Sequence, residues 1–195
     1  MSVAEQLPVP DAVAFERDGR DFVCTAQQWL PRSPAALFRF FGDCRHMNFV
    51  LPPFVRFDVL GDMPPLAEGV TYDYRLKLHG FPLRWRTRIG RVESPHWFED
   101  FQERGPYASF VHRHEFVERD GGTLTLDRIT YRPPGGRLLA PLANRLCVQR
   151  DLRRLFEHRH AAMRTLYAGD ADPAELLDAL EPGTYPSAVA LPEAA

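Results

Sequence analysis

The stretch Phe110-Val-His-Arg-His-Glu-Phe-Val117 decides the fold class of this 195-residue chain. Side chains alternate between the two faces of a β-strand, so one face of this stretch carries Phe110, His112, His114 and Phe116. A face that only filled a core would carry aliphatic side chains. Two imidazoles between two phenylalanines instead predict a sheet wall that meets a ligand, a metal or a buried carboxylate.

This strand belongs to a series of antiparallel strands that runs from Val70 to Tyr131. Turn residues divide the series at Gly80, Ser94-Pro95, Gly105-Pro106 and Gly121-Gly122. The glycine pair follows Asp120, and this combination predicts a hairpin. We expect strands at 55–60, 70–79, 82–93, 97–103, 107–118 and 123–132.

One strand and two short helices precede this series. Residues 21–30 have the pattern of a strand, and Ser33 and Pro34 then provide an N-cap and a first helical residue. This helix is expected to end near Gly42, and a second helical turn follows over 44–49. Residues 1–20 contain two prolines and little periodicity, which predicts an N-terminal arm or a short edge strand.

A long helix is predicted from about Gly136, where the period of the apolar residues changes to three and four. About 28 residues at 1.5 Å each give a helix of about 40 Å, enough to cross a curved sheet. Its apolar face would carry Leu142, Leu146, Gln149, Leu152, Phe156, Arg159, Met163 and Leu166. A short helix is expected at 173–180, within a C-terminal extension over 169–195 that we predict to be mobile.

Together these elements predict an α+β fold, in which a curved antiparallel sheet wraps around the long C-terminal helix. The domain would span residues 21–168, and the two short helices would close one end. A straight helix cannot fill the whole space inside the concave face of a strongly curved sheet, so a cavity should remain between the helix and the sheet. Cavities of this kind hold small, largely apolar molecules.

Several blocks of the sequence resemble the SRPBCC superfamily (START/Bet v 1-like, helix-grip), and within it a bacterial polyketide cyclase/dehydrase-like, ligand-binding subgroup. The blocks match in order and spacing: Glu68-Gly69, Tyr72–Ile89, Phe98–Gln102, Gly105–Tyr107, His112-Arg-His114 with Phe116, and Gly122-Thr123 with Asp127 and Tyr131. The resemblance covers about Asp21 to Arg164. One departure is Phe110, where the subgroup is expected to have tryptophan; a smaller ring would reshape the pocket.

The resemblance implies a helix-grip fold, a cavity for a small hydrophobic ligand, and a monomer or homodimer. Members of the superfamily bind, carry, cyclise or sense small molecules, so it implies no single reaction. Our first hypothesis is a carrier or sensor of a lipid, isoprenoid, quinone or polyketide-like molecule. The alternative is a cyclase or dehydratase that moves protons with a His–Asp pair.

The polar residues allow three interpretations. His112 and His114 have the spacing of two metal ligands, with Asp100 or Asp127 as a third, but no further histidine lies in this strand cluster, so we predict no metal. In an enzyme, the catalytic residues would be His112, His114, Asp100 and Asp127. Otherwise the same residues form a buried hydrogen-bond network that positions the strands and the ligand.

Alternation along 97–103 leaves two options for the residues that face inward. They are either Phe98, Asp100 and Gln102, or Trp97 and Phe101 with Glu99 and Glu103. The resemblance favours the first. The predicted ligand-binding residues are Tyr74, Trp85, Phe98, Asp100, Gln102, Phe110, His112, His114, Asp127, Tyr131 and Phe156.

Composition narrows the class of protein further. A formal net charge of −2 gives no overall basic field, so no nucleic-acid partner is expected. Three widely spaced cysteines without a CxxC pair indicate a reducing compartment, and no apolar run reaches membrane-spanning length, so we predict a cytoplasmic protein without integral membrane association. No glycine-rich strand-to-helix turn is present, and no cofactor is predicted.

Overall fold

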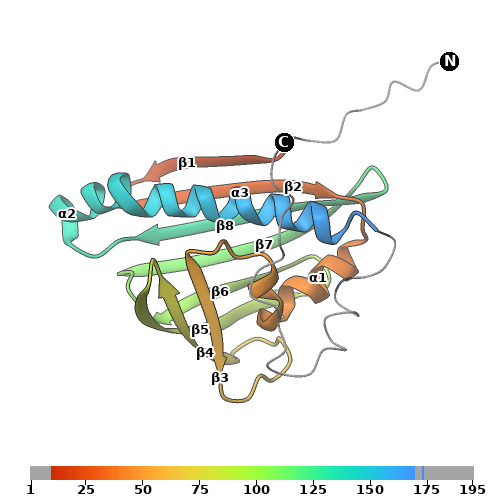
Figure 1. The fold of residues 1–195 in the computed structure, drawn as a ribbon, viewed down its shortest axis with the longest axis horizontal. Coiled ribbons are helices and arrows are strands. Elements are labelled where there is room, and N and C mark those ends of the chain that lie inside the picture. Colours follow the sequence, from red (N-terminus) through yellow and green to blue (C-terminus); the bar gives the residue numbers. More distant parts are fainter. Residues whose placement is uncertain (1–9, 170–172, 174–195) are drawn as a thin grey trace.

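Eight antiparallel strands form one curved sheet in the computed structural model, which describes residues 10–169 and residue 173 (Figure 1). The order across the sheet is β1-β2-β8-β7-β6-β5-β4-β3. The strands are β1 (Ala12–Asp18), β2 (Asp21–Leu30), β3 (Val55–Leu60), β4 (Thr71–Leu78), β5 (Phe81–Glu93), β6 (Trp97–Arg104), β7 (Ser109–Arg119) and β8 (Gly122–Arg132). Of the two options for the N-terminal segment, the edge strand is present as β1, paired with β2.

Two short helical segments connect β2, inside the sheet, to β3 at its far edge. They are the helix α1 (Pro34–Gly42) and the 3₁₀ turn η1 (Cys44–Phe49). Ser33 caps α1 as predicted, because its Oγ accepts a hydrogen bond from the backbone N–H of Ala36 at 3.3 Å. Both segments therefore begin and end close to where the sequence predicted.

Substitution of the N-cap, Ser33→Ala, should lower the free energy of unfolding by about 1 kcal/mol, because the first turn of α1 then loses a hydrogen-bond acceptor. Urea denaturation of both proteins measures this difference. Ser33→Asp is the matched control, since a carboxylate accepts the same hydrogen bond and should retain the stability of the parent protein. Equal losses in both variants would contradict the capping role.

The β7–β8 hairpin turns through Asp120 and Gly121, one residue earlier than the predicted glycine pair. Both residues have a left-handed backbone, with φ of 51° and 75°. Two successive positive φ angles are the signature of the two-residue turn that suits the twist of a hairpin. The turn sets the register in which His114 lies opposite Asp127.

The C-terminal helix crosses the sheet as predicted, but it is not a regular α-helix throughout. It consists of α2 (Gly136–Ala143), a π-helical turn η2 (Asn144–Val148) and α3 (Gln149–Leu166). The predicted face is confirmed in α3, where Leu152, Phe156 and Met163 are buried.

The predicted face is wrong in the first part of the helix. Leu142 and Leu146 are 53% and 58% exposed, while Ala140 and Asn144 are buried. A π turn contains one residue more than an α turn, and one residue corresponds to about 100° of rotation. The extra residue therefore brings Asn144 onto the sheet and turns the two leucines into solvent.

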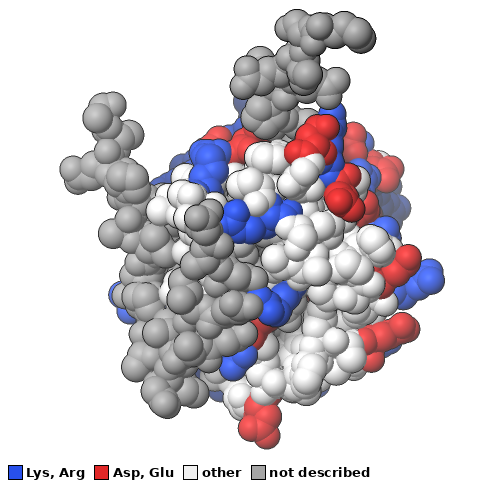
Figure 2. All heavy atoms as spheres, turned by 90° about the vertical axis from the view of Figure 1, so that its right-hand side faces the viewer, with Lys and Arg blue, Asp and Glu red and all other residues white. Residues whose placement is uncertain are grey.

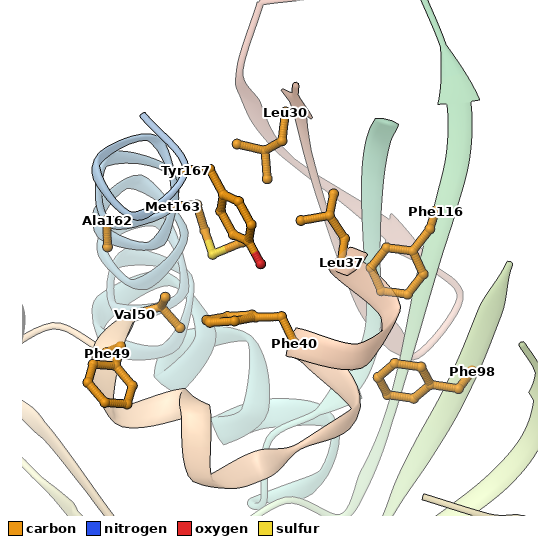
Figure 3. Packing of buried hydrophobic residues seen from close by; sticks show 10 residues of the cluster. All are labelled: Leu30, Leu37, Phe40, Phe49, Val50, Phe98, Phe116, Ala162, Met163 and Tyr167. Atoms are coloured by element: carbon orange, nitrogen blue, oxygen red, sulfur yellow. The ribbon is translucent and has the colours of Figure 1, made fainter. Parts of the chain in front are cut away.

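A cluster of buried apolar side chains joins α1, the sheet and the end of α3 (Figure 3). Met163 and Tyr167 point toward Phe40 and Leu37 of α1, and the Phe40 and Tyr167 rings meet edge to face at 5.9 Å. Phe98 and Phe116 approach α1 from the sheet, as Figure 3 shows. This packing closes the α1 end of the space between sheet and helix.

Charge is mixed on the surface at this end of the molecule. Figure 2 shows basic and acidic side chains interspersed around a largely uncharged central area of the described surface. None of the helices within residues 10–169 combines the length and the apolar run that crossing a membrane requires. The short helix expected at 173–180 and the rest of the extension lie outside the described residues, apart from Gly169 and Pro173.

Candidate functional site

A cavity of about 330 Å³ lies between the concave face of the sheet and α3. This volume is at the lower end of the range for small-molecule sites. Apolar side chains make up most of its wall, and they come from the sheet, the β6–β7 turn, α1, η1 with the segment after it, and the C-terminal helix: Phe41, Met47, Leu51, Phe54, Phe57, Tyr74, Leu76, Trp85, Ile89, Phe98, Tyr107, Phe110, Ile129, Leu152, Leu155 and Phe156. A molecule inside would contact mainly rings and aliphatic groups.

One part of the wall is polar, and strand register explains how it forms. Asp100 of β6 lies opposite His112 of β7, and His114 of β7 lies opposite Asp127 of β8. Alternation directs all four side chains to the concave face. The sheet thus brings together two carboxylates and two imidazoles from three neighbouring strands.

A single oxygen of Asp127 organises this group. Its Oδ1 lies 2.8 Å from His112 Nε2, 2.8 Å from His114 Nδ1 and 3.5 Å from Arg159 Nη1. Burial raises the pKa of Asp127, but the hydrogen bonds from the two histidines and the charges of His114 and Arg159 outweigh it. They hold the pKa of this carboxyl well below its usual range, so Asp127 is ionised.

The pKa values of the two histidines are shifted in opposite directions although the rings are neighbours, with centroids 3.8 Å apart. Burial lowers the pKa of His112, and the adjacent His114 lowers it further against the opposing carboxylates. Burial also acts to lower the pKa of His114, but the carboxylates of Asp100 and Asp127 outweigh it, and this pKa is raised. The pair therefore takes up one proton before the other.

Arg159 is the site residue that the sequence analysis missed. It was placed on the apolar face of the helix but not in the site, and its side chain proves to be 4% exposed and part of the cavity wall. Its guanidinium lies over the rings of Phe41 and Phe156, at 5.7 and 4.9 Å, and its Nε has no hydrogen-bond partner. The sequence feature that could have indicated this role is an arginine on a largely apolar helix face, since a buried arginine is normally paired.

Most of the predicted ligand-binding residues are brought together in the cavity wall. They are Tyr74, Trp85, Phe98, Asp100, Phe110, His112, His114 and Phe156. The first option for 97–103 is the one observed, since Phe98 and Asp100 face inward. Trp97 lies on the other face of β6, where the Arg113 guanidinium is 3.8 Å from its ring centroid.

Three predicted residues lie outside the cavity wall. The Gln102 amide donates to the Tyr107 carbonyl at 2.8 Å and its Oε1 accepts from the Tyr107 N–H at 3.1 Å, so it holds the β6–β7 turn. Asp127 lies behind the two histidines and acts through them. Tyr131 is fully buried and its hydroxyl donates to Asn144 Oδ1 at 2.7 Å, so it joins β8 to η2.

Tyr131→Phe should lower the free energy of unfolding by about 1–2 kcal/mol, because Asn144 Oδ1 loses its donor in a buried position. Binding of a hydrophobic fluorescent probe should not change, since Tyr131 is outside the wall. The double variant Tyr131→Phe/Asn144→Ala should lose little more free energy of unfolding than either single variant. A double-mutant cycle measures this coupling. Loss of probe binding without loss of stability would contradict this structural role.

Asp100, His112 and His114 each offer a possible metal-ligand atom, and these atoms lie within 4.8 Å of one another. The histidines and Asp127 could instead serve proton transfer, since His112 has a lowered pKa and faces the cavity. In either use, Arg159 supplies a positive charge beside the group.

Comparisons with known proteins agree with this architecture. Structures similar in fold include protein Ms6760 from Mycobacterium smegmatis, with a TM-score of 0.58 and 19% identity over 78% of this chain and 96% of that chain. A protein from Arthrobacter aurescens has a TM-score of 0.60 and 12% identity over 78% and 91% of the two chains. For Ara h 8.0201 the TM-score is 0.55, with 13% identity over 74% and 99%.

At sequence identities of 12–19%, the similarity to these structures shows the fold alone. No curated protein matches the sequence at a significant level. A family model described as "Polyketide cyclase / dehydrase and lipid transport" matches residues 30–158, which include the whole polar group except Arg159. The chain therefore belongs to the polyketide cyclase/dehydrase and lipid transport family, within the SRPBCC superfamily of helix-grip proteins.

Proposed function

We propose that this protein binds one small amphipathic molecule in the cavity between the sheet and α3, as a carrier or sensor. The observation that carries the proposal is a largely apolar cavity of about 330 Å³ whose wall includes the polar group of Asp100, His112, His114 and Arg159. The apolar lining suits a lipid, an isoprenoid or quinone, or a polyketide-like molecule. The family description, which includes lipid transport, supports the same class of ligand.

The polar group in the cavity wall determines which part of the ligand would lie beside it. Arg159 has an unpartnered buried N–H, and burial of such a donor is costly. A carbonyl or carboxylate oxygen of the ligand would satisfy it. The ligand would thus place an oxygen at Arg159 and the histidines, and its hydrocarbon part along Phe110, Trp85 and Phe156.

Native mass spectrometry of the purified full chain, followed by organic extraction, tests this proposal. We expect a co-purified molecule, or stoichiometric binding of a fluorescent fatty-acid probe. Leu155→Trp adds an indole to the cavity wall and should abolish binding, while Val117→Trp adds the same group at an exposed position and should not. Equal binding by both variants would place the ligand outside the cavity and refute the proposal.

A second function, proton transfer on a polyketide-like substrate, is favoured by one specific observation. His112 has a lowered pKa, lies in the cavity wall and is oriented by ionised Asp127 at 2.8 Å. This is the arrangement of a general base fixed by a carboxylate. Turnover of the extracted molecule with a bell-shaped pH profile, lost in His112→Gln, would support the enzyme over the carrier.

The proposal includes a cytoplasmic location and a monomer or homodimer. Cys24, Cys44 and Cys147 are free thiols, as a reducing compartment would maintain them. Analytical ultracentrifugation of the full chain measures the oligomeric state.

A further inference from the structure

The position of the protons on the two histidines follows from Asp127. A carboxylate oxygen accepts hydrogen bonds, and Asp127 Oδ1 lies 2.8 Å from both His112 Nε2 and His114 Nδ1 and 3.5 Å from Arg159 Nη1. Each of these nitrogens must therefore carry a proton. The second nitrogens of the two rings, His112 Nδ1 and His114 Nε2, each have a lone pair available whenever their ring is neutral.

Both of these nitrogens lie near the same carboxylate. Asp100 Oδ2 lies 4.0 Å from His112 Nδ1 and 3.5 Å from His114 Nε2, which is longer than an ordinary hydrogen bond. All three side chains are largely buried, with 10–16% of each exposed. Two ring nitrogens and a carboxylate oxygen thus lie close together without an ordinary hydrogen bond between them, and a proton on one ring would satisfy only one of the two nitrogens.

We propose that Asp100, His112 and His114 bind a divalent transition-metal ion of the zinc class. In a tetrahedral zinc site with bonds of about 2.0–2.1 Å, neighbouring ligand atoms are about 3.3 Å apart. Asp100 Oδ2 lies 3.5 and 4.0 Å from the two nitrogens, and the candidate ligand atoms of all three residues lie within 4.8 Å of one another, so the side chains would move inward to bind an ion. Two imidazoles and one carboxylate suit Zn²⁺, and with open positions also Fe²⁺.

The surroundings of the three ligands also fit a metal. Metal-bound histidines commonly donate their other N–H to a carboxylate, which fixes the ring and its tautomer. Asp127 accepts both of these hydrogen bonds here, and its own orientation is supported by Arg159. Among residues 10–169 and 173, no further His, Cys, Asp or Glu joins this group, so a bound ion keeps at least one open position.

The open position faces the cavity, since all three ligands are part of its wall. This step rests on the proposed function: the oxygen of a bound amphipathic molecule would coordinate the metal and also contact Arg159. The ligand class narrows to hydrophobic molecules with an oxygen donor, such as a carboxylate, an enolate or a β-diketone. A hydrocarbon without oxygen would gain nothing from the ion.

Metal binding can be tested without any organic ligand. The untagged full chain is stripped with a chelator and titrated with Zn²⁺ and with Co²⁺, whose visible absorption reports coordination. We expect one ion per chain. His114→Gln and Asp100→Asn should each weaken binding by roughly 100-fold or more, because loss of even an outer partner costs about 10–100-fold. His96→Gln, at an exposed position, should bind as the parent protein does.

Circular dichroism of the metal-free variants shows whether each is folded, and Asp100→Asn changes the side-chain shape least. Failure of the folded parent protein to bind one Zn²⁺ or Co²⁺, or binding that both variants retain, would overturn the metal site. The fluorescent fatty-acid probe is measured in parallel on the metal-free and the metal-treated protein. Probe binding without metal binding would overturn this inference and leave the proposed function standing, and metal binding without probe binding in either form would do the reverse.

Discussion

Asp127→Asn should lower the free energy of unfolding by about 3–5 kcal/mol at neutral pH, the typical cost of removing one partner from a buried charge group. The Asp127 carboxylate is the common acceptor of His112, His114 and Arg159. An amide oxygen carries no charge to balance the buried guanidinium. Urea denaturation at pH 7 measures the loss. Asp58→Asn, at an exposed position of β3, is the control and should cost little.

The same substitution should change how stability depends on pH. The pKa of Asp127 is lower in the folded protein than its unfolded value of about 3.9. The unfolded chain therefore binds a proton first, and the stabilisation by this carboxylate is full above pH 5 and decreases as the pH falls below about 4. Asp127→Asn lacks this contribution at every pH. Parallel stability curves for the two proteins between pH 5 and pH 2 would contradict the ionised state of Asp127.

Arg159→Met should weaken binding of a fatty-acid probe about 10–100-fold, because a hydrogen bond to a charged group contributes about 1.5–3 kcal/mol. A fatty alcohol of the same chain length should lose much less, since methionine retains most of the apolar contact. Titration of both probes by fluorescence measures the difference. Arg153→Met, on the exposed side of the same helix, is the control.

Equal losses for the acid and the alcohol would mean that Arg159 shapes the wall and does not recognise the polar end of the ligand. Stability must be measured alongside, because Arg159 also contacts Asp127. The two histidines still donate to that carboxylate in Arg159→Met, so we expect the variant to remain folded.

The sheet was predictable because its pattern is local. Alternation and turn residues located β2 to β8, and the same alternation placed His112 and His114 on the concave face. Register across strands then brought Asp100 and Asp127 to them. The long helix was predictable from its period, but the period cannot reveal a π turn, because one extra residue changes the phase without changing the residue types.

The site was less predictable for reasons that involve three dimensions. Tyr131 has a residue type suited to ligand contact, but its hydroxyl is taken by Asn144, which only the π turn brings near. Arg159 has a residue type usually found in solvent, but it lies over two rings beside a buried carboxylate. In both cases the role depends on a partner distant in the chain, which the local pattern does not encode.

The π turn η2 also marks the place where this helix can change its length. A π turn differs from an α turn by one inserted residue, so deletion of one residue within 144–148 would restore a regular helix and leave α2 and α3 in their present phase. Deletion between Leu152 and Phe156 would instead rotate these two cavity residues apart by about 100°. Insertions and deletions among relatives should therefore concentrate at η2, where they change the wall only near Cys147 and Val148 and keep the cavity-facing phase of Leu152 and Phe156.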